Sequence, residues 1–254
     1  MSEILSVNGL FVAYGEKKVV RDVNFTVKRG EIVIIAGESG SGKSTVLKSI
    51  VGLLGSGGNV IHGRIFFDGR EITHLSAKKR RKLSGDAIGF IFQNAGASFC
   101  PIRTIGDQIF EIIRSHRDWD EKFFRERAID FMRKINLDSD VLNEYPFKLS
   151  GGMAQRAGIL AATIREPKIL LADEPTSALD VVNQAGVVKE LLKLRERQKI
   201  SIVMVTHDLK IAKIMADKIL IMKNGLQIEF GTREQIFDAP KEIYTQKLLK
   251  AANL

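Results

Sequence analysis

The stretch of sequence that decides the fold is Gly37-Glu38-Ser39-Gly40-Ser41-Gly42-Lys43-Ser44-Thr45. It has the pattern G-x-x-x-x-G-K-[S/T], in which glycines let main-chain N–H groups close around phosphate oxygens. Lys43 can reach the outer phosphates of a nucleotide, and the Ser44 hydroxyl can bind Mg²⁺. An apolar run at 32–36 precedes the stretch and a helical run at 45–54 follows it, so we predict a strand, a phosphate-binding loop and a helix. By itself the pattern indicates binding of a nucleoside triphosphate, but neither which one nor for what purpose.

A second apolar run, 169–172, ends in the two carboxylates of Asp173 and Glu174. Asp173 can hold Mg²⁺ through water, and Glu174, which points in another direction, can polarise an attacking water. An exposed acidic turn after a strand is the simpler interpretation of such a pair. The phosphate-binding loop upstream favours the catalytic interpretation.

A pair of glycines stands just before that run, in Leu149-Ser150-Gly151-Gly152-Met153-Ala154-Gln155. Ser150 is a suitable N-cap for a helix that runs to about residue 164. The glycines permit close approach of a ligand to the main chain, so the helix start would form a second anion site. Two such sites in one chain suggest that each nucleotide is clamped between two chains, although an ordinary capped helix has the same signature.

Composition bounds the class of protein. The chain has 254 residues and a formal net charge of +9, which favours acidic partners: nucleotide phosphates, nucleic acid or an anionic membrane surface. Cys100 is the only cysteine, so an internal disulfide and a zinc site built on cysteine pairs are excluded. There is no basic-then-apolar signal peptide and no apolar run of bilayer length. We therefore expect a cytosolic protein, or one held at a membrane by something else.

The order of patterns predicts an α/β fold with a parallel sheet covered by helices. Valine-rich strands are expected first, then helical character from about 78 to 163, where Asp120 is a possible N-cap. After that, short buried strands alternate with helical stretches. The expected strands are 5–14, 19–27, 65–67 with a turn at Asp68-Gly69, 168–172, 200–205 and a late hairpin at 219–230, and the expected helices include 124–135 and 179–196.

These motifs, in this order, resemble the ATP-binding subunit of an ATP-binding-cassette (ABC) transporter over almost the whole chain. In that family, 37–45 is the Walker A loop, 169–173 is Walker B and 149–155 is the signature motif, which binds the γ-phosphate of a nucleotide held by the partner subunit. The resemblance implies a P-loop NTPase core with an N-terminal antiparallel β subdomain. It implies a single nucleotide-binding domain over 1–254, with a helical insertion at about 95–163.

The resemblance also implies roles for single residues. Gln93 matches the glutamine that senses Mg²⁺ and couples to the membrane subunits, and Asp180 matches the D-loop across the dimer. His207 matches the switch histidine at the γ-phosphate, and Tyr14 matches the aromatic residue that stacks on adenine. The implied catalytic residues are Lys43, Glu174 and His207, the implied metal-binding residues are Ser44, Gln93 and Asp173, and the implied ATP-binding residues are Tyr14, Gly37 to Thr45, Gln93, Ser150, Gly151, Gly152 and Asp180.

Three stretches resemble the dipeptide, oligopeptide and nickel importer branch: 93–109, 145–147 and 231–249. Phe99-Cys100 and Glu242-Ile243 depart from that branch's usual residues. The sequence shows no longer, cysteine-bearing C-terminal extension of the kind that peptide importers often have, and in this it resembles the nickel or metallophore importers. The expected function is therefore ATP hydrolysis that powers import of nickel, a metallophore or short peptides. The nickel, if transported, would be recognised by other subunits.

The resemblance implies ATP and Mg²⁺ as cofactors and a peripheral position on the cytoplasmic face of the cell membrane. The implied partners are a second, related but non-identical ATPase subunit, two membrane permeases and, through them, an extracellular solute-binding protein. The alternatives are the ATPase of an exporter and a soluble ABC ATPase that acts on nucleic acid or ribosomes. Nucleic acid is not expected, because the basic run 78–82 lacks interleaved aromatic residues and is better explained as a solvated helix face.

Overall fold

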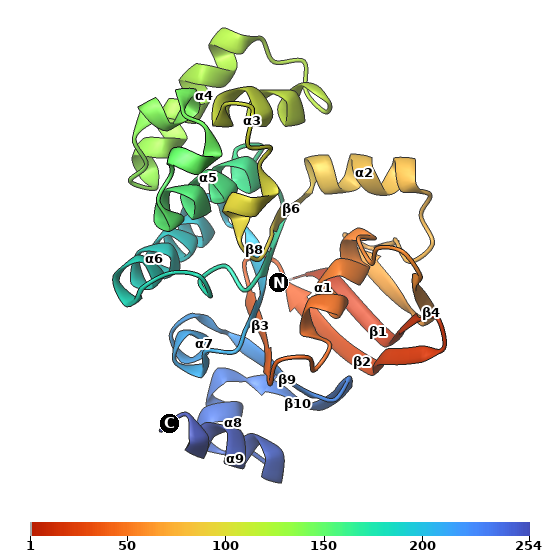
Figure 1. Cartoon of the computed structure of the whole chain (residues 1–254). Helices are drawn as coiled ribbons and strands as arrows, with labels where there is room; N and C mark the ends of the chain where they lie inside the picture. The colour runs from red at the N-terminus through yellow and green to blue at the C-terminus, as the bar shows by residue number, and fades with distance from the viewer. Residues whose placement is uncertain (1) are drawn as a thin grey trace.

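A ten-stranded sheet with the order β5-β4-β1-β2-β10-β9-β3-β8-β7-β6 organises the computed structural model, which describes residues 2–254 (Figure 1). In chain order the elements are β1 (Glu3–Tyr14), β2 (Lys17–Lys28), β3 (Ile32–Gly37), α1 (Lys43–Val51), β4 (Gly58–Phe67), β5 (Arg70–Glu71), α2 (Ala77–Asp86), β6 (Ile88–Ile91), η1 (Ala95–Ser98), α3 (Ile105–Arg114), α4 (Glu121–Lys134), η2 (Ser139–Asn143), η3 (Pro146–Lys148), α5 (Gly151–Thr163), β7 (Ile169–Asp173), α6 (Val181–Gln198), β8 (Ser201–Thr206), α7 (Leu209–Met215), β9 (Lys218–Lys223), β10 (Leu226–Thr232), α8 (Arg233–Asp238) and α9 (Ile243–Ala251).

The sheet has an antiparallel part and a parallel part. β1 pairs antiparallel with β2 and β4, whereas β3, β8, β7 and β6 pair in parallel, and β9 runs parallel to β3. The parts meet where β10 pairs with β2 through Leu226 and Arg21. This arrangement confirms the predicted α/β fold with a parallel core and an antiparallel N-terminal part.

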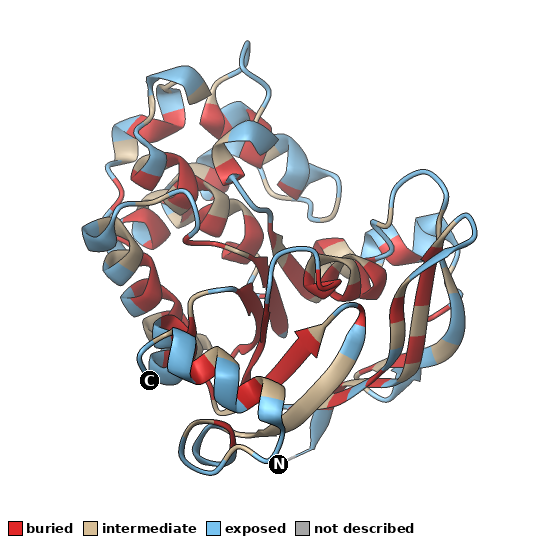
Figure 2. Cartoon of the chain, turned by 60° about the horizontal axis from the view of Figure 1, so that its bottom comes forward, coloured by how far each residue is buried: buried red, intermediate tan, exposed pale blue. Residues whose placement is uncertain are grey.

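Both faces of the parallel part are buried. Ile32, Ile34 and Ala36 of β3 join one apolar cluster, and Val33 and Ile35 join the other, because successive side chains of a strand point to opposite faces. The first cluster includes side chains of α5, α6 and α7, and the second includes those of α1. Figure 2 shows the buried strands between these layers. The carboxyl ends of β3, β7 and β8 meet at one edge, where ligands of such sheets bind.

The elements between β6 and β7 are helical. α4 begins after Asp120, whose side chain accepts a hydrogen bond of 2.7 Å from the Phe123 N–H, as the sequence predicted. Phe124 and Ala128 of α4 are buried in the first apolar cluster. The N-cap and the apolar spacing together explain why this segment forms a helix.

The expectation of helix from 78 onward was wrong for 88–91. Ile88 to Ile91 form β6, which pairs in parallel with β7 from Ile88↔Ile169 to Ile91↔Ala172. Gly89 lies against the Ala162 carbonyl, and a Cβ built there would come within 2.4 Å of that oxygen. Four apolar residues carry no periodicity that separates a buried strand from a helix, so the pairing partner decides the structure.

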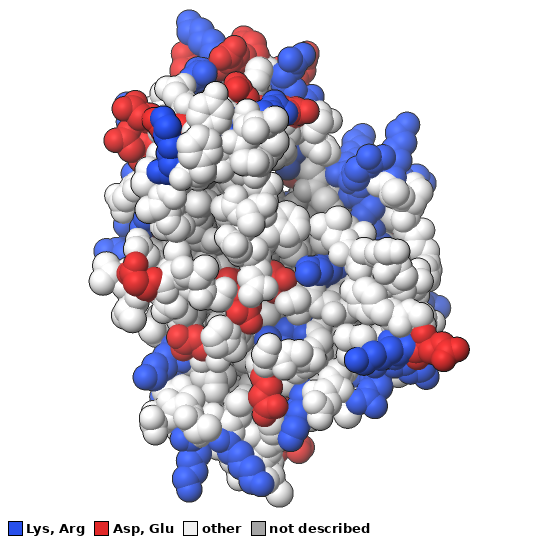
Figure 3. All heavy atoms as spheres, in the orientation of Figure 1, with Lys and Arg blue, Asp and Glu red and all other residues white. Residues whose placement is uncertain are grey.

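The basic run is only partly a solvated face, as the Arg80 side chain shows. Arg80 is buried at 8% exposure, and its guanidinium donates to the carbonyl oxygens of Ile50 at 2.6 Å and Thr73 at 2.8 Å. Burial lowers the pKa of Arg80. Figure 3 shows the cationic side chains gathered over α2. The exposed members of the run are Lys78, Lys79, Arg81 and Lys82.

We expect Arg80→Met to lower the free energy of unfolding by about 2–4 kcal/mol, because two buried carbonyl groups lose a charged donor. Arg81→Met, on the exposed side of the same helix, is the matched control and should change it by less than about 0.5 kcal/mol. Urea denaturation followed by circular dichroism measures both values. Equal values for the two variants would show that the Arg80 hydrogen bonds contribute nothing.

Candidate nucleotide-binding site

The phosphate-binding loop leaves the end of β3 and enters α1 through glycines with positive φ. The φ angles are 145° at Gly37, 77° at Gly40 and 96° at Gly42, where a residue with a side chain would be strained. Gly37 also lies so close to β9 that a Cβ would come within 2.1 Å of the Met222 carbonyl oxygen. Gly42 is the N-cap of α1 and provides no side-chain hydrogen bond, so the first N–H groups of that helix remain available to an anion.

Lys43 is held inside the loop. Its exposure is 4%, and its ammonium donates to the carbonyl oxygens of Gly37 at 2.9 Å and Glu38 at 2.7 Å. Burial lowers the pKa of Lys43, and the nearby Glu174 and Asp173 carboxylates oppose that change. A cation is thus fixed where the loop glycines expose their N–H groups, which is the arrangement that phosphate binding needs.

Ser44 connects the loop to the end of β7. Its hydroxyl donates a hydrogen bond of 2.6 Å to Oδ1 of Asp173. Asp173 is buried, and burial raises its pKa while the Ser44 hydrogen bond opposes the rise. The pair supplies two hard oxygen groups beside the loop, which suits Mg²⁺, because this ion takes one or two carboxylates together with substrate phosphates and water.

Glu174 and His207 form the opposite side of the site. His207 Nδ1 lies 3.0 Å from Oε2 of Glu174. Glu174 has a φ of 45°, a conformation that side-chain-bearing residues seldom adopt and that concentrates at functional sites. Its main chain is held there by donation from its N–H to the Val205 carbonyl at 3.0 Å. The acid is therefore aimed by the ends of β7 and β8 together.

One cavity of about 460 Å³ brings these groups together. Its lining includes most of the predicted loop, together with Gln93, Glu174 and His207, which come from three separate segments of the chain. The lining residues are Val19, Ser39, Gly40, Gly42, Lys43, Ser44, Thr45, Gln93, Glu174 and His207.

Besides Asp173 and members of the phosphate-binding loop, five predicted residues lie outside this cavity. Tyr14 stands at the end of β1, beside Gly58, where an added Cβ would come within 2.8 Å of its ring. Ser150, Gly151 and Gly152 begin α5, and the Ser150 hydroxyl accepts from the Met153 N–H at 3.3 Å, as predicted for an N-cap. None of them lines the cavity of the phosphate-binding loop, and their nucleotide contacts, like those of the lining residues, stay predictions.

Asp180, the fifth, caps α6 next to the signature glycines. A Cβ at Gly152 would come within 2.7 Å of Asn183 Oδ1, and Asn183 donates to Asp180 from both its main chain and its side chain. These hydrogen bonds lower the pKa of Asp180. The starts of α5 and α6 therefore form one polar surface, built from the two motifs that the sequence predicted to face a partner chain.

Two parts of the site were not predicted. Val19 of β2 lines the cavity, and it gives no sequence signal, because it is an ordinary strand valine. The turn of the β9–β10 hairpin supports the loop: the Gly225 N–H donates to the Ser41 carbonyl at 3.0 Å. The Asn224-Gly225 turn was predicted, but only the sheet order places it against the loop.

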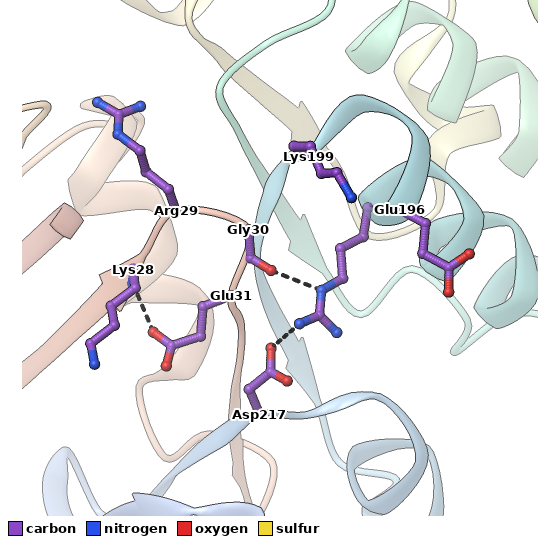
Figure 4. A pocket seen from close by; sticks show the side chains of 8 residues that line it. Lys28, Arg29, Gly30, Glu31, Glu196, Lys199 and Asp217 are labelled. Atoms are coloured by element: carbon purple, nitrogen blue, oxygen red, sulfur yellow. Dashed lines mark hydrogen bonds and ion pairs between the residues drawn. The ribbon is translucent and has the colours of Figure 1, made fainter. Parts of the chain in front are cut away.

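A second cavity, of about 820 Å³, lies at the amino ends of β3 and β8, away from the phosphate-binding loop (Figure 4). Arg195 crosses it, donating to the Gly30 carbonyl at 2.8 Å and to the Asp217 carboxylate at 2.7 Å. The Lys28 N–H donates to Glu31 at 2.7 Å. These bonds tie the β2–β3 turn to α6 and to the start of β9, so we interpret this cavity as structural.

The comparisons with known proteins agree with this geometry. Residues 20–177 match the family described as ABC transporter. The dipeptide transport ATP-binding protein DppD of Escherichia coli is 40% identical, over 98% of this chain and 78% of that protein. The metal-staphylopine import system ATP-binding protein CntD of Staphylococcus aureus is 37% identical, over 97% of this chain and 92% of that protein.

Solved structures show the same fold. The ATP-binding cassette MJ0796, described as a dimer bound to ADP and Pi, superimposes with a TM-score of 0.81 at 29% identity over 91% of this chain and 99% of its own. The protein cbiO1 of Clostridium perfringens, part of the ABC transporter complex cbiONQ, has a TM-score of 0.81 at 27% identity over 100% of this chain and 95% of its own. The chain belongs to the ABC transporter family, as one of its ATP-binding cassettes.

Proposed function

We propose that this chain hydrolyses ATP to power an importer of short peptides or of a metal bound to a metallophore. The single cavity that joins Lys43, Gln93, Glu174 and His207 carries the proposal, since it holds a phosphate-binding cation, a candidate base and its histidine neighbour. The relatives named for dipeptide transport and for metal-staphylopine import support the substrate classes.

The chain's own residues divide the work of phosphoryl transfer. Lys43 and the loop N–H groups hold the β- and γ-phosphates, and Tyr14 stacks on the adenine. Glu174 accepts the proton of the attacking water. His207, whose Nδ1 lies 3.0 Å from the Glu174 carboxylate, orients that carboxylate toward the γ-phosphate. Ser44, Asp173 and Gln93 would hold Mg²⁺, which would neutralise charge on the phosphates. Catalysis is then mostly positioning and charge stabilisation.

Each complete site needs a second chain. Ser150, Gly151, Gly152 and Asp180 lie outside the cavity of this chain and share one surface at the starts of α5 and α6. We assign this surface to the nucleotide of a partner ATPase subunit, related to this chain but not identical to it. The dimer described for MJ0796 supports a two-chain arrangement.

The permeases dock beside Gln93. Phe92, directly before Gln93, is exposed, and so is Ile102, which lies between η1 and α3 and is 82% exposed. Within residues 2–254, none of the helices is long and apolar enough to cross a bilayer. We place the chain on the cytoplasmic face of the cell membrane through two permeases, which receive the solute from an extracellular binding protein.

A pull-down from membranes in gentle detergent, followed by mass spectrometry, tests this function. We expect two multi-span permeases, a second ATPase and a solute-binding protein to accompany the wild-type chain. Ile102→Asp should lose the permeases because it places a charge in the apolar docking surface. Ile61→Asp, at an exposed residue of β4, is the matched control and should retain them. Recovery with ribosomes or DNA in the soluble fraction would overturn the transport function.

A further inference from the structure

The C-terminal helix α9 is tied to the hairpin that supports the phosphate-binding loop. The Glu229 carboxylate of β10 accepts hydrogen bonds from the N–H groups of Lys241 at 2.9 Å and Glu242 at 3.3 Å, so the start of α9 is fixed to β10. This anchor determines where Tyr244, the second residue of α9, can lie.

Tyr244 lies next to the end of β9. The Lys223 ammonium stands 4.3 Å from the centroid of the Tyr244 ring, close enough for a cation–π interaction. Two residues farther along, the Gly225 N–H donates to the Ser41 carbonyl of the phosphate-binding loop. The tyrosine ring is therefore packed on the same turn that supports the loop.

The Tyr244 side chain lies near Glu38 of the loop, because Lys223, which stands over its ring, follows Met222, and Met222 pairs with Gly37. The Tyr244 hydroxyl oxygen is shielded from solvent and has no hydrogen-bond partner within residues 2–254. Burial, and after it the interaction with the Glu38 side chain, raise the pKa of Tyr244 to about 12. The phenol keeps its proton at neutral pH, so it is an O–H donor without a competing partner. A Glu38 carboxylate that turned toward it would satisfy this buried polar group.

Glu38 affects phosphate binding in two ways. Its carbonyl oxygen accepts from the Lys43 ammonium at 2.7 Å, so its main-chain position determines where that cation stands. Its carboxylate is a negative charge in a loop that receives phosphates, and like charges at close range repel. A donor that holds the carboxylate on the α9 side reduces this repulsion and orders the loop.

We propose that Tyr244 is a positioning residue for the phosphate-binding loop, acting through Glu38 to keep the loop in the geometry that binds the β- and γ-phosphates. Helix α9, far from the loop in sequence, then belongs to the nucleotide site. The inference rests on the proposed function, because it assumes that a nucleotide binds at Lys43.

Titration calorimetry of the full chain with AMP-PNP and Mg²⁺ tests the proposal in a double-mutant cycle. Tyr244→Phe keeps the ring beneath Lys223 and removes only the hydroxyl. We expect it to raise the Kd by about 5- to 10-fold with an unchanged melting temperature. In the Glu38→Ala background the same substitution should change the Kd by less than about twofold, because its partner is already absent. Tyr145→Phe, on the far helical part of the chain, is the matched control and should leave the Kd unchanged.

The outcomes separate this inference from the function beneath it. Failure of the wild-type chain to bind AMP-PNP would overturn the proposed function and the inference together. If the wild-type chain binds and Tyr244→Phe binds equally well, the inference alone is wrong. A loss of the same size with and without Glu38 would show that Tyr244 acts by packing and not through Glu38, which also overturns it.

Discussion

Glu174→Gln is expected to slow ATP hydrolysis by about 10²- to 10⁴-fold while ATP remains bound, because the amide keeps the shape of the side chain but no longer accepts a proton. Loop contacts to the phosphates do not involve Glu174, so affinity should be retained. The steady-state rate of ATP hydrolysis by the assembled transporter measures this effect. Calorimetry measures ATP binding separately.

The matched control for this prediction is Glu196→Gln on the exposed side of α6, at the other large cavity. It removes the same charge far from the nucleotide and should leave both the hydrolysis rate and ATP binding unchanged. Turnover of Glu174→Gln at the wild-type rate would eliminate Glu174 as the base, whatever the control shows.

Lys43→Ala is expected to weaken ATP binding by about 100-fold, which corresponds to about 2.7 kcal/mol. The variant removes a cation that is buried against the loop and hydrogen-bonded to its carbonyl oxygens, at the place where the phosphates need a positive charge. The loss should be larger for ATP than for adenosine, since only ATP presents phosphates to this group. Calorimetry with both ligands measures the difference.

Two further variants show whether the loss comes from the charge. Lys43→Met keeps most of the buried volume and should lose affinity as strongly as Lys43→Ala, with a melting temperature closer to that of the wild-type chain. Lys189→Ala removes an exposed lysine of α6 and should bind ATP normally. Unchanged affinity in both Lys43 variants would refute the assignment of the phosphate-binding loop.

Much of the fold could be predicted because local patterns and tertiary packing agree. The strand of 32–36 could be predicted because the phosphate-binding pattern follows it, and the hairpin of 219–230 because of its Asn224-Gly225 turn. The Asp120 and Ser150 caps lie where their side chains satisfy helix N–H groups. β6 could not be predicted, because Ile88 to Ile91 is apolar throughout and only pairing with β7 makes it a strand. Arg80 was likewise predicted to be exposed because its neighbours are charged, whereas its side chain lies on the buried side of α2.

The sequence by itself determined the chemical groups and their local geometry: the glycines of the loop, the lysine and serine that follow, and the acids at the end of β7. Those features depend on residue type and on spacing within a single turn, strand or cap, so residues close together in the sequence control them. Only the tertiary structure decided which distant groups meet. Parallel pairing of β7 with β8 places His207 beside Glu174, and parallel pairing of β3 with β9 places Gly225 beside Ser41. The attachment of α9 to β10 then brings Tyr244 next to Lys223 and the phosphate-binding loop. Register in a sheet depends on burial of both faces at once, and no single stretch of the chain encodes that.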